Sequence, residues 1–432
     1  MRHSLGDSGI GNEPFCLTAS EAARRIASGQ LRPEALMEAC LDRIAAREPI
    51  VHAFAWLDPE QARRAAATAR PGKLHGLPVG VKDVLDTADM PSEYNSPIWR
   101  GHRPRADAAA VAWAREAGAV VVGKTVTTEF ANRHPGPTAN PHDPRRTPGG
   151  SSSGSAAAVA DYFLPLAFGT QTAGSIIRPA AFCGIIGFKP SFGLINRHGM
   201  KLMSDSLDTV GVLARSVADC ALFAGAVAGV DLGEPDVKPD PAPRIGLCRS
   251  PVWEQASPET QALLLDAGDR LARSGATVGP CELPEDFSHL IAAHPLVMHA
   301  ESARALGWEM TTAREAISAE LRERLEWALA QPETALGEAR AVLERTRLAF
   351  PAAMDGFDVL LTPAAPGEAP EGLGWTGDPV FNFIWTSLHV PCVAIPAGEG
   401  PAGMPLGLQV VARRGEDREA LAWAQWIAAA LG

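Results

Sequence analysis

Residues 147–190, TPGGSSSGSAAAVADYFLPLAFGTQTAGSIIRPAAFCGIIGFKP, contain two clusters of glycine and serine, at 149–154 and 173–175. The run between the clusters is long enough for only a helix and a strand, and it is apolar enough to be buried. Buried hydroxyl groups need hydrogen-bond partners, because an unpaired polar group inside a protein costs free energy. We therefore expect this stretch to hold a polar site inside the core.

Short apolar strands alternate with helices on both sides of this stretch. Within it, 155–160 and 176–182 are predicted as helices and 164–168 as a strand. Upstream, a strand at 77–81 ends at the charged pair Lys82 and Asp83. The other helices are predicted near 19–28, 33–46, 59–69, 108–118, 216–229, 258–274 and 417–430, and the other strands near 52–57, 119–122, 244–248, 277–283, 357–361, 391–395 and 406–411. This alternation predicts an α/β fold with one large twisted sheet.

Three segments fall outside that alternation. Residues 1–14 are predicted to be a disordered leader, and 231–243, rich in Pro, Asp and Gly, a linker. The block 286–354 is rich in Ala, Glu, Arg and Leu, so we expect it to be almost entirely helical and to form a lid or cap over a pocket.

The composition is that of an ordinary globular enzyme with an acidic balance. Apolar residues make up 46% of the chain, charged residues 21%, and the formal net charge is -11. This charge makes nucleic acid and anionic membranes unfavourable partners. The chain lacks a transmembrane-length apolar run and a signal peptide, so a cytoplasmic location is expected. The seven scattered cysteines, none in C-x-x-C spacing, are expected to be reduced and mostly buried.

Motifs for metals and phosphates are weak. The histidines are dispersed, H-E-x-x-H does not occur, and His134 and His142 lie in a Pro-rich loop without a third ligand. Segment 149–154 has the glycines of a phosphate-binding loop, but no lysine follows it. We therefore expect neither a metal nor an organic cofactor.

Residues 150–154, GSSSG, also fit G-x-S-x-G, the nucleophile elbow of α/β-hydrolases, with Ser152 as nucleophile. That elbow needs a strand directly before the serine, whereas the Pro-rich segment 140–148 cannot form a central strand. His389, the candidate histidine partner, precedes Val390 and fits a packing role better. An esterase of this type that uses Ser152 is kept as an alternative.

A serine nucleophile can instead be activated by a lysine. A serine hydroxyl is a poor nucleophile at neutral pH and needs a base within hydrogen-bond reach. Lysine can be that base when it is neutral, and burial in apolar surroundings favours the neutral amine. Lys82, at the end of an apolar strand, is expected to have such surroundings.

Several motifs taken together resemble the amidase signature family. They are GVKD at 80–83, PGGSSSGSAAA at 148–158, GTQTAGS at 169–175, RPAAFCG at 178–184, FKP at 188–190, SLDTVG at 206–211 and PLGLQ at 405–409. The 24-residue step from Ser151 to Ser175 matches the family's spacing between its catalytic serines. The resemblance extends from about residue 18 to the end of the sequence.

The fold implied by the resemblance is a large mixed twisted sheet of about 10–11 strands, covered by helices on both faces. It also implies a single domain over 15–432, with a signature core at about 75–215 and a helical cap at about 286–354.

The resemblance also implies roles for single residues. Ser175 would be the nucleophile, Ser151 a bridging serine held by a cis peptide, and Lys82 the terminal base. Neutral Lys82 would take a proton from Ser175 through Ser151 and return it to the leaving amine. The backbone N–H groups implied as the oxyanion hole are those of Thr172, Ala173, Gly174 and Ser175. Ser152 is expected to support the loop by hydrogen bonding, with substrate contact as its alternative role.

Two positions depart from the family's usual pattern. Gln171 stands where the family has an acidic residue, and Ile177 stands where it has an arginine, so both members of an ion pair are absent together. Arg178 resembles the arrangement in malonamidase-like members, in which this arginine anchors a substrate carboxylate. Bracing the loop or a helix end is its alternative role.

The function implied is a metal-independent serine hydrolase that cleaves a carbonyl C–N bond through an acyl-enzyme on Ser175. Small or aryl amides are the first expected substrates, and carbamates, urea-like compounds and esters share the same tetrahedral chemistry. The amidase subunit of an amidotransferase complex is the alternative function. An inactive binding protein is disfavoured, because all three catalytic positions are filled. A monomer or a homodimer is expected.

Overall fold

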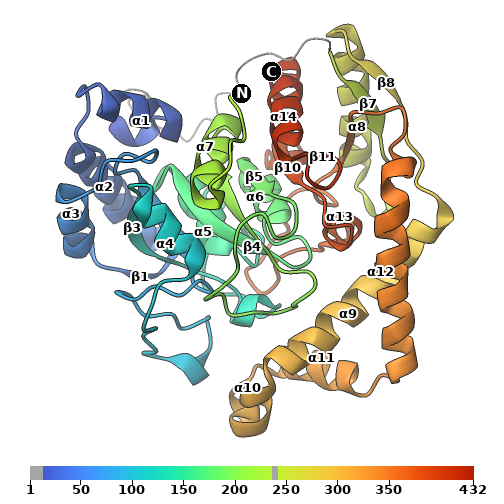
Figure 1. The fold of residues 1–432 in the computed structure, drawn as a ribbon, viewed down its shortest axis with the longest axis horizontal. Coiled ribbons are helices and arrows are strands. Elements are labelled where there is room, and N and C mark those ends of the chain that lie inside the picture. Colours follow the sequence, from blue (N-terminus) through green and yellow to red (C-terminus); the bar gives the residue numbers. More distant parts are fainter. Residues whose placement is uncertain (1–12, 236–241) are drawn as a thin grey trace.

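The computed structural model describes residues 13–235 and 242–432, and its centre is a mixed sheet of 11 strands. The strand order is β1-β3-β2-β4-β6-β5-β10-β11-β9-β7-β8, and helices flank the sheet (Figure 1). The α/β fold with one large mixed sheet, expected from the sequence, is therefore confirmed.

The strands come from all parts of the chain. Parallel pairs join β2 to β3 and β4, and β7 to β8 and β9. The pairs in the middle of the sheet are antiparallel. The bounds are β1 Phe54–Leu57, β2 Pro78–Lys82, β3 Val120–Thr125, β4 Leu166–Gln171, β5 Ile186–Lys189, β6 Thr209–Ala214, β7 Arg244–Leu247, β8 Thr277–Pro280, β9 Val359–Pro363, β10 Cys392–Glu399 and β11 Pro405–Val411.

Ten of the α-helices in the described residues belong to the body of the molecule, and most of them pack on the sheet or on one another. Every residue of β2, β3, β4 and β6 is buried, which explains why these strands read as continuous apolar runs rather than alternating ones. The bounds are α1 Ala19–Ala27, α2 Pro33–Val51, α3 Pro59–Ala67, α4 Ala109–Glu116, α5 Ser153–Ala160, α6 Ile177–Cys183, α7 Val217–Ala228, α8 Pro258–Arg273, α13 Phe383–Ser387 and α14 Asp417–Leu431.

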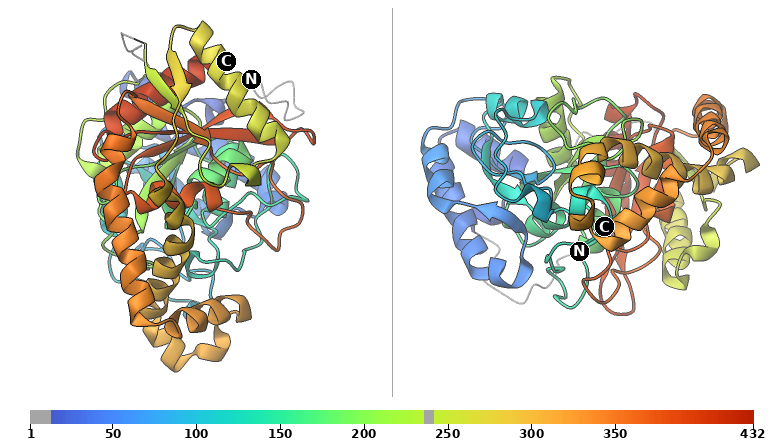
Figure 2. Two further views of the ribbon diagram at one scale, coloured as in Figure 1. Left: turned by 90° about the vertical axis from the view of Figure 1, so that its right-hand side faces the viewer. Right: turned by 90° about the horizontal axis from the view of Figure 1, so that it is seen from below.

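The other four helices, α9 Leu290–Ala305, α10 Gly307–Thr312, α11 Ala319–Leu329 and α12 Glu333–Ala353, form an arm that extends from the body (Figures 1 and 2). The far end of the arm returns to the body, where Leu306, Leu321 and Leu325 form a buried cluster with Tyr94 and Phe130. Apolar contact thus holds the arm against the segment that follows β3.

Side-chain caps define where several helices begin. The hydroxyl of Thr18 accepts a hydrogen bond from the N–H of Glu21, as expected from the sequence, and Ser216 caps α7 in the same way. α7 ends at Gly229, which adopts a left-handed conformation that glycine takes without steric cost.

Two features differ from the sequence-based expectations. α2 continues to Val51 instead of ending near residue 46: the helix tolerates Pro49 in its last turn, and His52 terminates it in a left-handed conformation. The carboxylate of Glu48 then accepts the N–H groups of Ala53 and Phe54, the chain entering β1. Strands β5 and β6 were not predicted, and both lie in the middle of the sheet.

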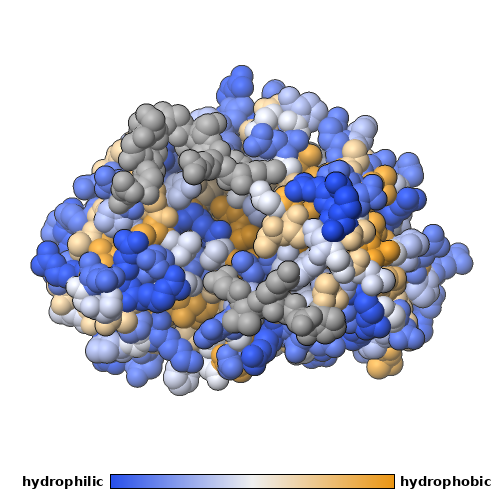
Figure 3. All heavy atoms as spheres, turned by 90° about the horizontal axis from the view of Figure 1, so that it is seen from above, coloured by the Kyte–Doolittle hydropathy of each residue, from blue (hydrophilic) through white to orange (hydrophobic). Residues whose placement is uncertain are grey.

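One face of the molecule shows how hydrophilic and hydrophobic residues are distributed on the surface. Hydrophilic residues cover most of the face seen in Figure 3, with hydrophobic residues scattered among them. Within residues 13–235 and 242–432, no helix is both long and apolar enough to span a membrane. Most of the leader expected at 1–14 and about half of the linker expected at 231–243 lie outside the described residues.

Candidate active site

Lys82 ends β2 and is fully buried. Since β4 runs parallel to β2, with Gly80 opposite Ala167, the ends of the two strands reach the same edge of the sheet. Lys82 Nζ lies 2.7 Å from Thr170 Oγ1 and 2.8 Å from Ser151 Oγ. Burial lowers the pKa of Lys82 to about 7, and the carboxyl group of Asp208 opposes this shift in part.

Ser151 is presented by the turn that precedes α5, and the peptide bond between Gly150 and Ser151 is cis. Close packing holds the start of α5 in place. A methyl group on Gly154 would lie 2.1 Å from the carbonyl oxygen of Ala53 and 2.4 Å from the amide nitrogen of Val126, so only glycine fits there.

Ser175 lies between β4 and α6 and is one of the residues that line a cavity of about 30 Å³. The hydroxyl of Ser151 is bonded to Lys82, whereas Ser175 meets this turn through its backbone, its carbonyl oxygen accepting the N–H of Ser152 at 3.4 Å. The structure therefore places Lys82 and Ser151 in direct contact, with Ser175 adjacent at the cavity. The other lining residues are Ala131, Asn132, Arg133, Thr172, Ala173, Arg178, Met203, Met298, His299, Thr376, Gly377 and Pro379.

The loop between β4 and Ser175 is held by a buried carboxyl group. The hydroxyl of Thr172 donates to the carboxyl group of Asp208, which also accepts the N–H groups of Met203 at 2.7 Å and Ser204 at 3.0 Å. Burial raises the pKa of Asp208 to about 6. A loop with such supports keeps its backbone N–H groups in a fixed orientation, as anion stabilisation requires.

Arg178 is buried in the first turns of α6 and faces the same cavity. Its Nη2 donates to the carbonyl oxygen of Gly150 at 2.6 Å and to Thr376 Oγ1 at 3.2 Å. Its Nε and Nη1 have no partner within the described residues. Burial and the nearby charge of Arg133 lower the pKa of Arg178 to about 9. One nitrogen thus braces the turn that carries Ser151, and two remain able to donate.

Ser152 is buried and makes its hydrogen bonds to the backbone of β4. Its hydroxyl oxygen lies 3.3 Å from both the N–H and the carbonyl oxygen of Thr170. Ser152 follows a loop instead of a strand, and His389 stacks on Phe192 at 4.1 Å with its Nε2 against the carbonyl oxygen of Ser206. Neither residue is among those that line the cavity of Ser175.

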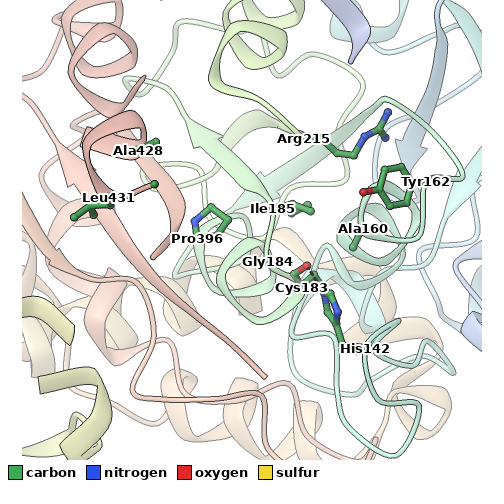
Figure 4. A pocket seen from close by; sticks show the side chains of 11 residues that line it. His142, Ala160, Tyr162, Cys183, Gly184, Ile185, Arg215, Pro396, Ala428 and Leu431 are labelled. Atoms are coloured by element: carbon green, nitrogen blue, oxygen red, sulfur yellow. Dashed lines mark hydrogen bonds between the residues drawn. The ribbon is translucent and has the colours of Figure 1, made fainter. Parts of the chain in front are cut away.

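Figure 4 shows the residues that line a second cavity, of about 260 Å³; they include Cys183 and Gly184, at the C-terminal end of α6. Arg215 and Tyr162 lie close together at its wall, and the guanidinium carbon of Arg215 is 4.8 Å from the ring centre. Arg215 donates to the carbonyl oxygens of Leu164, Phe15 and Leu17. These hydrogen bonds of its two terminal nitrogens connect the N-terminal segment to the body, which is a structural role.

Sequence reasoning did not assign Thr170 and Asp208 to the site. Thr170 lies inside the quoted motif at 169–175 and Asp208 inside the motif at 206–211, so the motifs themselves were the available signal. Arg133 and His299 line the cavity without belonging to any motif, since they arrive from the segment after β3 and from α9. Within residues 13–235 and 242–432, no group of three or more His, Cys, Asp or Glu side chains is arranged to hold a metal ion.

A buried lysine in contact with a serine, beside a cavity that contains a second serine, is typical of hydrolases that use an amine as base. The sequence profile of the Amidase family matches residues 35–421. The chain belongs to this amidase family, as its motifs indicated.

Individual relatives match over nearly the whole chain. A glutamyl-tRNA(Gln) amidotransferase subunit of Acidothermus cellulolyticus is 35% identical, over 91% of this chain and 90% of that protein. A crystal structure of an amidase superposes with a TM-score of 0.87 at 32% identity, covering 96% of this chain and all of that one. A peptide amidase in complex with the competitive inhibitor chymostatin gives a TM-score of 0.81 at 31% identity, over 95% and 96% of the two chains.

Proposed function

We propose that this protein is an amide hydrolase that uses Ser175 as nucleophile, Ser151 as proton bridge and Lys82 as base. The observation that carries the proposal is the contact of 2.8 Å between Lys82 Nζ and Ser151 Oγ at a fully buried amine. With its pKa lowered to about 7, a lysine buried in this way is neutral in about half of the molecules near pH 7 and can then accept a proton.

The proposed reaction balances as follows. Ser175 Oγ attacks the carbonyl carbon while its proton moves to Ser151, whose own proton passes to Lys82 Nζ. The C–N bond then breaks, and the proton returns through Ser151 to the leaving nitrogen. Water releases the acyl group by the same steps. The N–H groups of 172–175 stabilise the oxygen that becomes negative.

The proposed substrates are small or aryl amides, and carbamates and esters are tested alongside them. Arg178 is proposed to contact substrate, since two of its buried nitrogens lack partners within the described residues. The physical reason is that an unpaired guanidinium is stabilised by a carboxylate. A screen of neutral amides and dicarboxylic monoamides therefore comes first.

Covalent labelling tests the nucleophile. Treatment with a fluorophosphonate should give one adduct by intact mass, and fragment mapping should place it on Ser175. The adduct should be lost in Ser175→Ala and retained in Ser152→Ala, whose hydroxyl contacts only the backbone of β4. An adduct on Ser152 would instead support the esterase alternative.

A second candidate function is favoured by the sequence relatives: the amidase subunit of an amidotransferase complex. The relative in Acidothermus cellulolyticus, 35% identical, is one subunit of a glutamyl-tRNA(Gln) amidotransferase. Under this candidate the isolated chain would hydrolyse amides poorly and gain activity from partner chains. Purification of the tagged protein from its own cells, followed by mass spectrometry of stoichiometric partners, separates the two. A lone active monomer or homodimer would support the stand-alone hydrolase.

A further inference from the structure

The backbone next to Ser175 is held by two buried side chains outside the proposed proton relay, Gln171 at the end of β4 and Thr386 in α13. Gln171 Oε1 accepts the N–H groups of Ile176 at 2.9 Å and Ile177 at 3.0 Å. Gln171 Nε2 lies 3.0 Å from Thr386 Oγ1, which in turn lies 2.7 Å from the carbonyl oxygen of Ala173.

The chemistry of these groups fixes the direction of every hydrogen bond. Backbone N–H groups only donate, so the atom of Gln171 that faces them is the carbonyl oxygen, and the other atom is the amide nitrogen. That nitrogen only donates, so Thr386 Oγ1 accepts from it and must use its own proton toward Ala173. The result is a directed chain from Gln171 to Thr386 to the carbonyl oxygen of Ala173.

This chain sets the orientation of one peptide group. In a planar trans peptide the carbonyl oxygen and the following N–H point in opposite directions. Because the carbonyl of Ala173 points at Thr386, the N–H of Gly174 points away from α13. A side chain at Gly174 would also collide with Asn382, the residue before α13, because a methyl group there would lie 2.1 Å from Asn382 Oδ1. The peptide is thus locked from one side.

We propose that Gln171 and Thr386 are positioning residues that aim the N–H of Gly174 at the oxygen of the reacting carbonyl group. The inference rests on the proposed function, in which the N–H groups of 172–175 form the oxyanion hole. It also gives a reason for an amide at position 171. An ionised carboxylate there could still accept from Ile176 and Ile177, but it would draw the proton of Thr386 to itself and release Ala173.

The test uses the rate at which a fluorophosphonate modifies Ser175, because phosphonylation also develops charge on an oxygen and needs no known substrate. Thr386→Val removes the hydroxyl with little change of shape and should slow labelling at least about 10-fold, given that a misplacement near 1 Å can cost about 100-fold. Thr386→Ser keeps the hydroxyl and should stay within about 3-fold of the parent protein.

Gln171→Glu adds a readout that a purely structural role would not move. When protonated, the glutamic acid accepts from the backbone and donates to Thr386, as the amide does; when ionised, it cannot donate. The labelling rate of Gln171→Glu relative to the parent protein should therefore approach one at low pH and fall by at least about 10-fold as pH rises. A ratio that does not change with pH would overturn the inference.

A matched control distinguishes a misplaced peptide group from a general loss of protein stability. Thr346→Val removes a buried hydroxyl that is hydrogen-bonded within α12. This variant should lose about as much Tm as Thr386→Val, but it should be labelled at the same rate as the parent protein. Equal labelling of Thr386→Val and the parent protein, or equal slowing in Thr386→Val and Thr386→Ser, would contradict the inference. If the parent protein itself is not labelled on Ser175, the proposed function fails, and that result is distinct from a failure confined to the variants.

Discussion

At the scale of single residues, the chemistry proposed for Ser175 depends on one buried amine. Burial lowers the pKa of Lys82 to about 7. Because only the neutral amine accepts a proton, we expect the rate of acylation to rise with pH through about pH 7 and to level off above it. The labelling rate of Ser175, measured from about pH 5 to about pH 10, checks this. A profile that is flat through neutrality would remove Lys82 from the mechanism.

Removing the amine should abolish the reaction while keeping the fold. Lys82→Ala is expected to lower the rate by at least about 100-fold, the usual contribution of a positioned general base. Lys124, another fully buried lysine, offers a matched control: it pairs with Asp83 at 2.8 Å, and its hydrogen bonds go to Pro91 and Ser92 instead of Ser151. Lys124→Met should lose stability, because it leaves a buried carboxylate unpaired, and retain labelling. Near-normal labelling of Lys82→Ala would contradict the assignment.

The same pKa shift predicts how stability depends on pH. Between about pH 7 and the ordinary lysine pKa of about 10.4, the unfolded chain binds a proton at Lys82 that the folded protein does not, so the folded state gains stability as pH rises. Lys82→Met lacks this contribution. The difference in unfolding free energy between the parent protein and this variant should therefore shift in favour of the parent by up to about 1.4 kcal/mol per pH unit across that window. Urea denaturation at several pH values measures it, and a constant difference would contradict the shift.

Only those residues of the candidate site that lie in sequence motifs could be predicted from the sequence. Ser151, Ser175 and Lys82 stand in three quoted motifs, and the structure brings Lys82 and Ser151 into contact. The hydrogen bonds of Thr386 could not be predicted, because α13 contacts the loop across more than 200 positions of sequence. The sequence also left the role of Arg178 open. Its bond to Gly150 becomes visible only when α6 and the turn before α5 are placed together.

At the scale of elements, α5 is the helix that sets the position of Ser151. Close packing at the start of this helix requires glycine at position 154, and this requirement can be tested. Gly154→Ala would place a methyl group 2.1 Å from the backbone of Ala53, which cannot move without disturbing the chain entering β1. We expect a loss of about 1–3 kcal/mol and slower labelling, because the start of α5 must shift outward. Thermal unfolding and the labelling rate measure the two effects.

Gly337 in α12 is the matched control for that change. A methyl group there meets no other atom within 4 Å, and alanine is the better helix former. Gly337→Ala should therefore raise stability by about 0.5–1 kcal/mol and leave labelling unchanged. Equal effects of the two substitutions would show that packing of α5 does not determine the position of Ser151.

The elements themselves followed from sequence where periodicity or capping was clear, as for α1, α7 and α8. β5 and β6, with 4 and 6 residues, were not predicted; they are buried throughout and show no alternation, whereas β2, β3 and β4, buried in the same way, were predicted from their continuous apolar runs. Their place in the middle of the sheet comes from antiparallel pairing with β4 and β10. Long-range pairing of this kind leaves no local signal.

At the scale of the whole molecule, the seven cysteines are spread across the fold, and none forms a disulfide within the described residues, which include all seven. Six are buried, and burial raises the pKa of Cys40 and Cys248 to about 12. A thiol reagent needs access and a thiolate, so these six should react only when the protein opens. The half-exposed Cys16 should react first.

Titration with a thiol-reactive chromophore measures this opening. In the native protein we expect one fast thiol, absent in Cys16→Ser, followed by six slow ones that react together as the sheet unfolds. In denaturant all seven should react at once, and a reducing agent should leave Tm unchanged. If several thiols reacted quickly under native conditions while activity persisted, the strands and helices that bury them would open independently of the site. The single sheet that joins β1 to β8 would then not act as one cooperative unit.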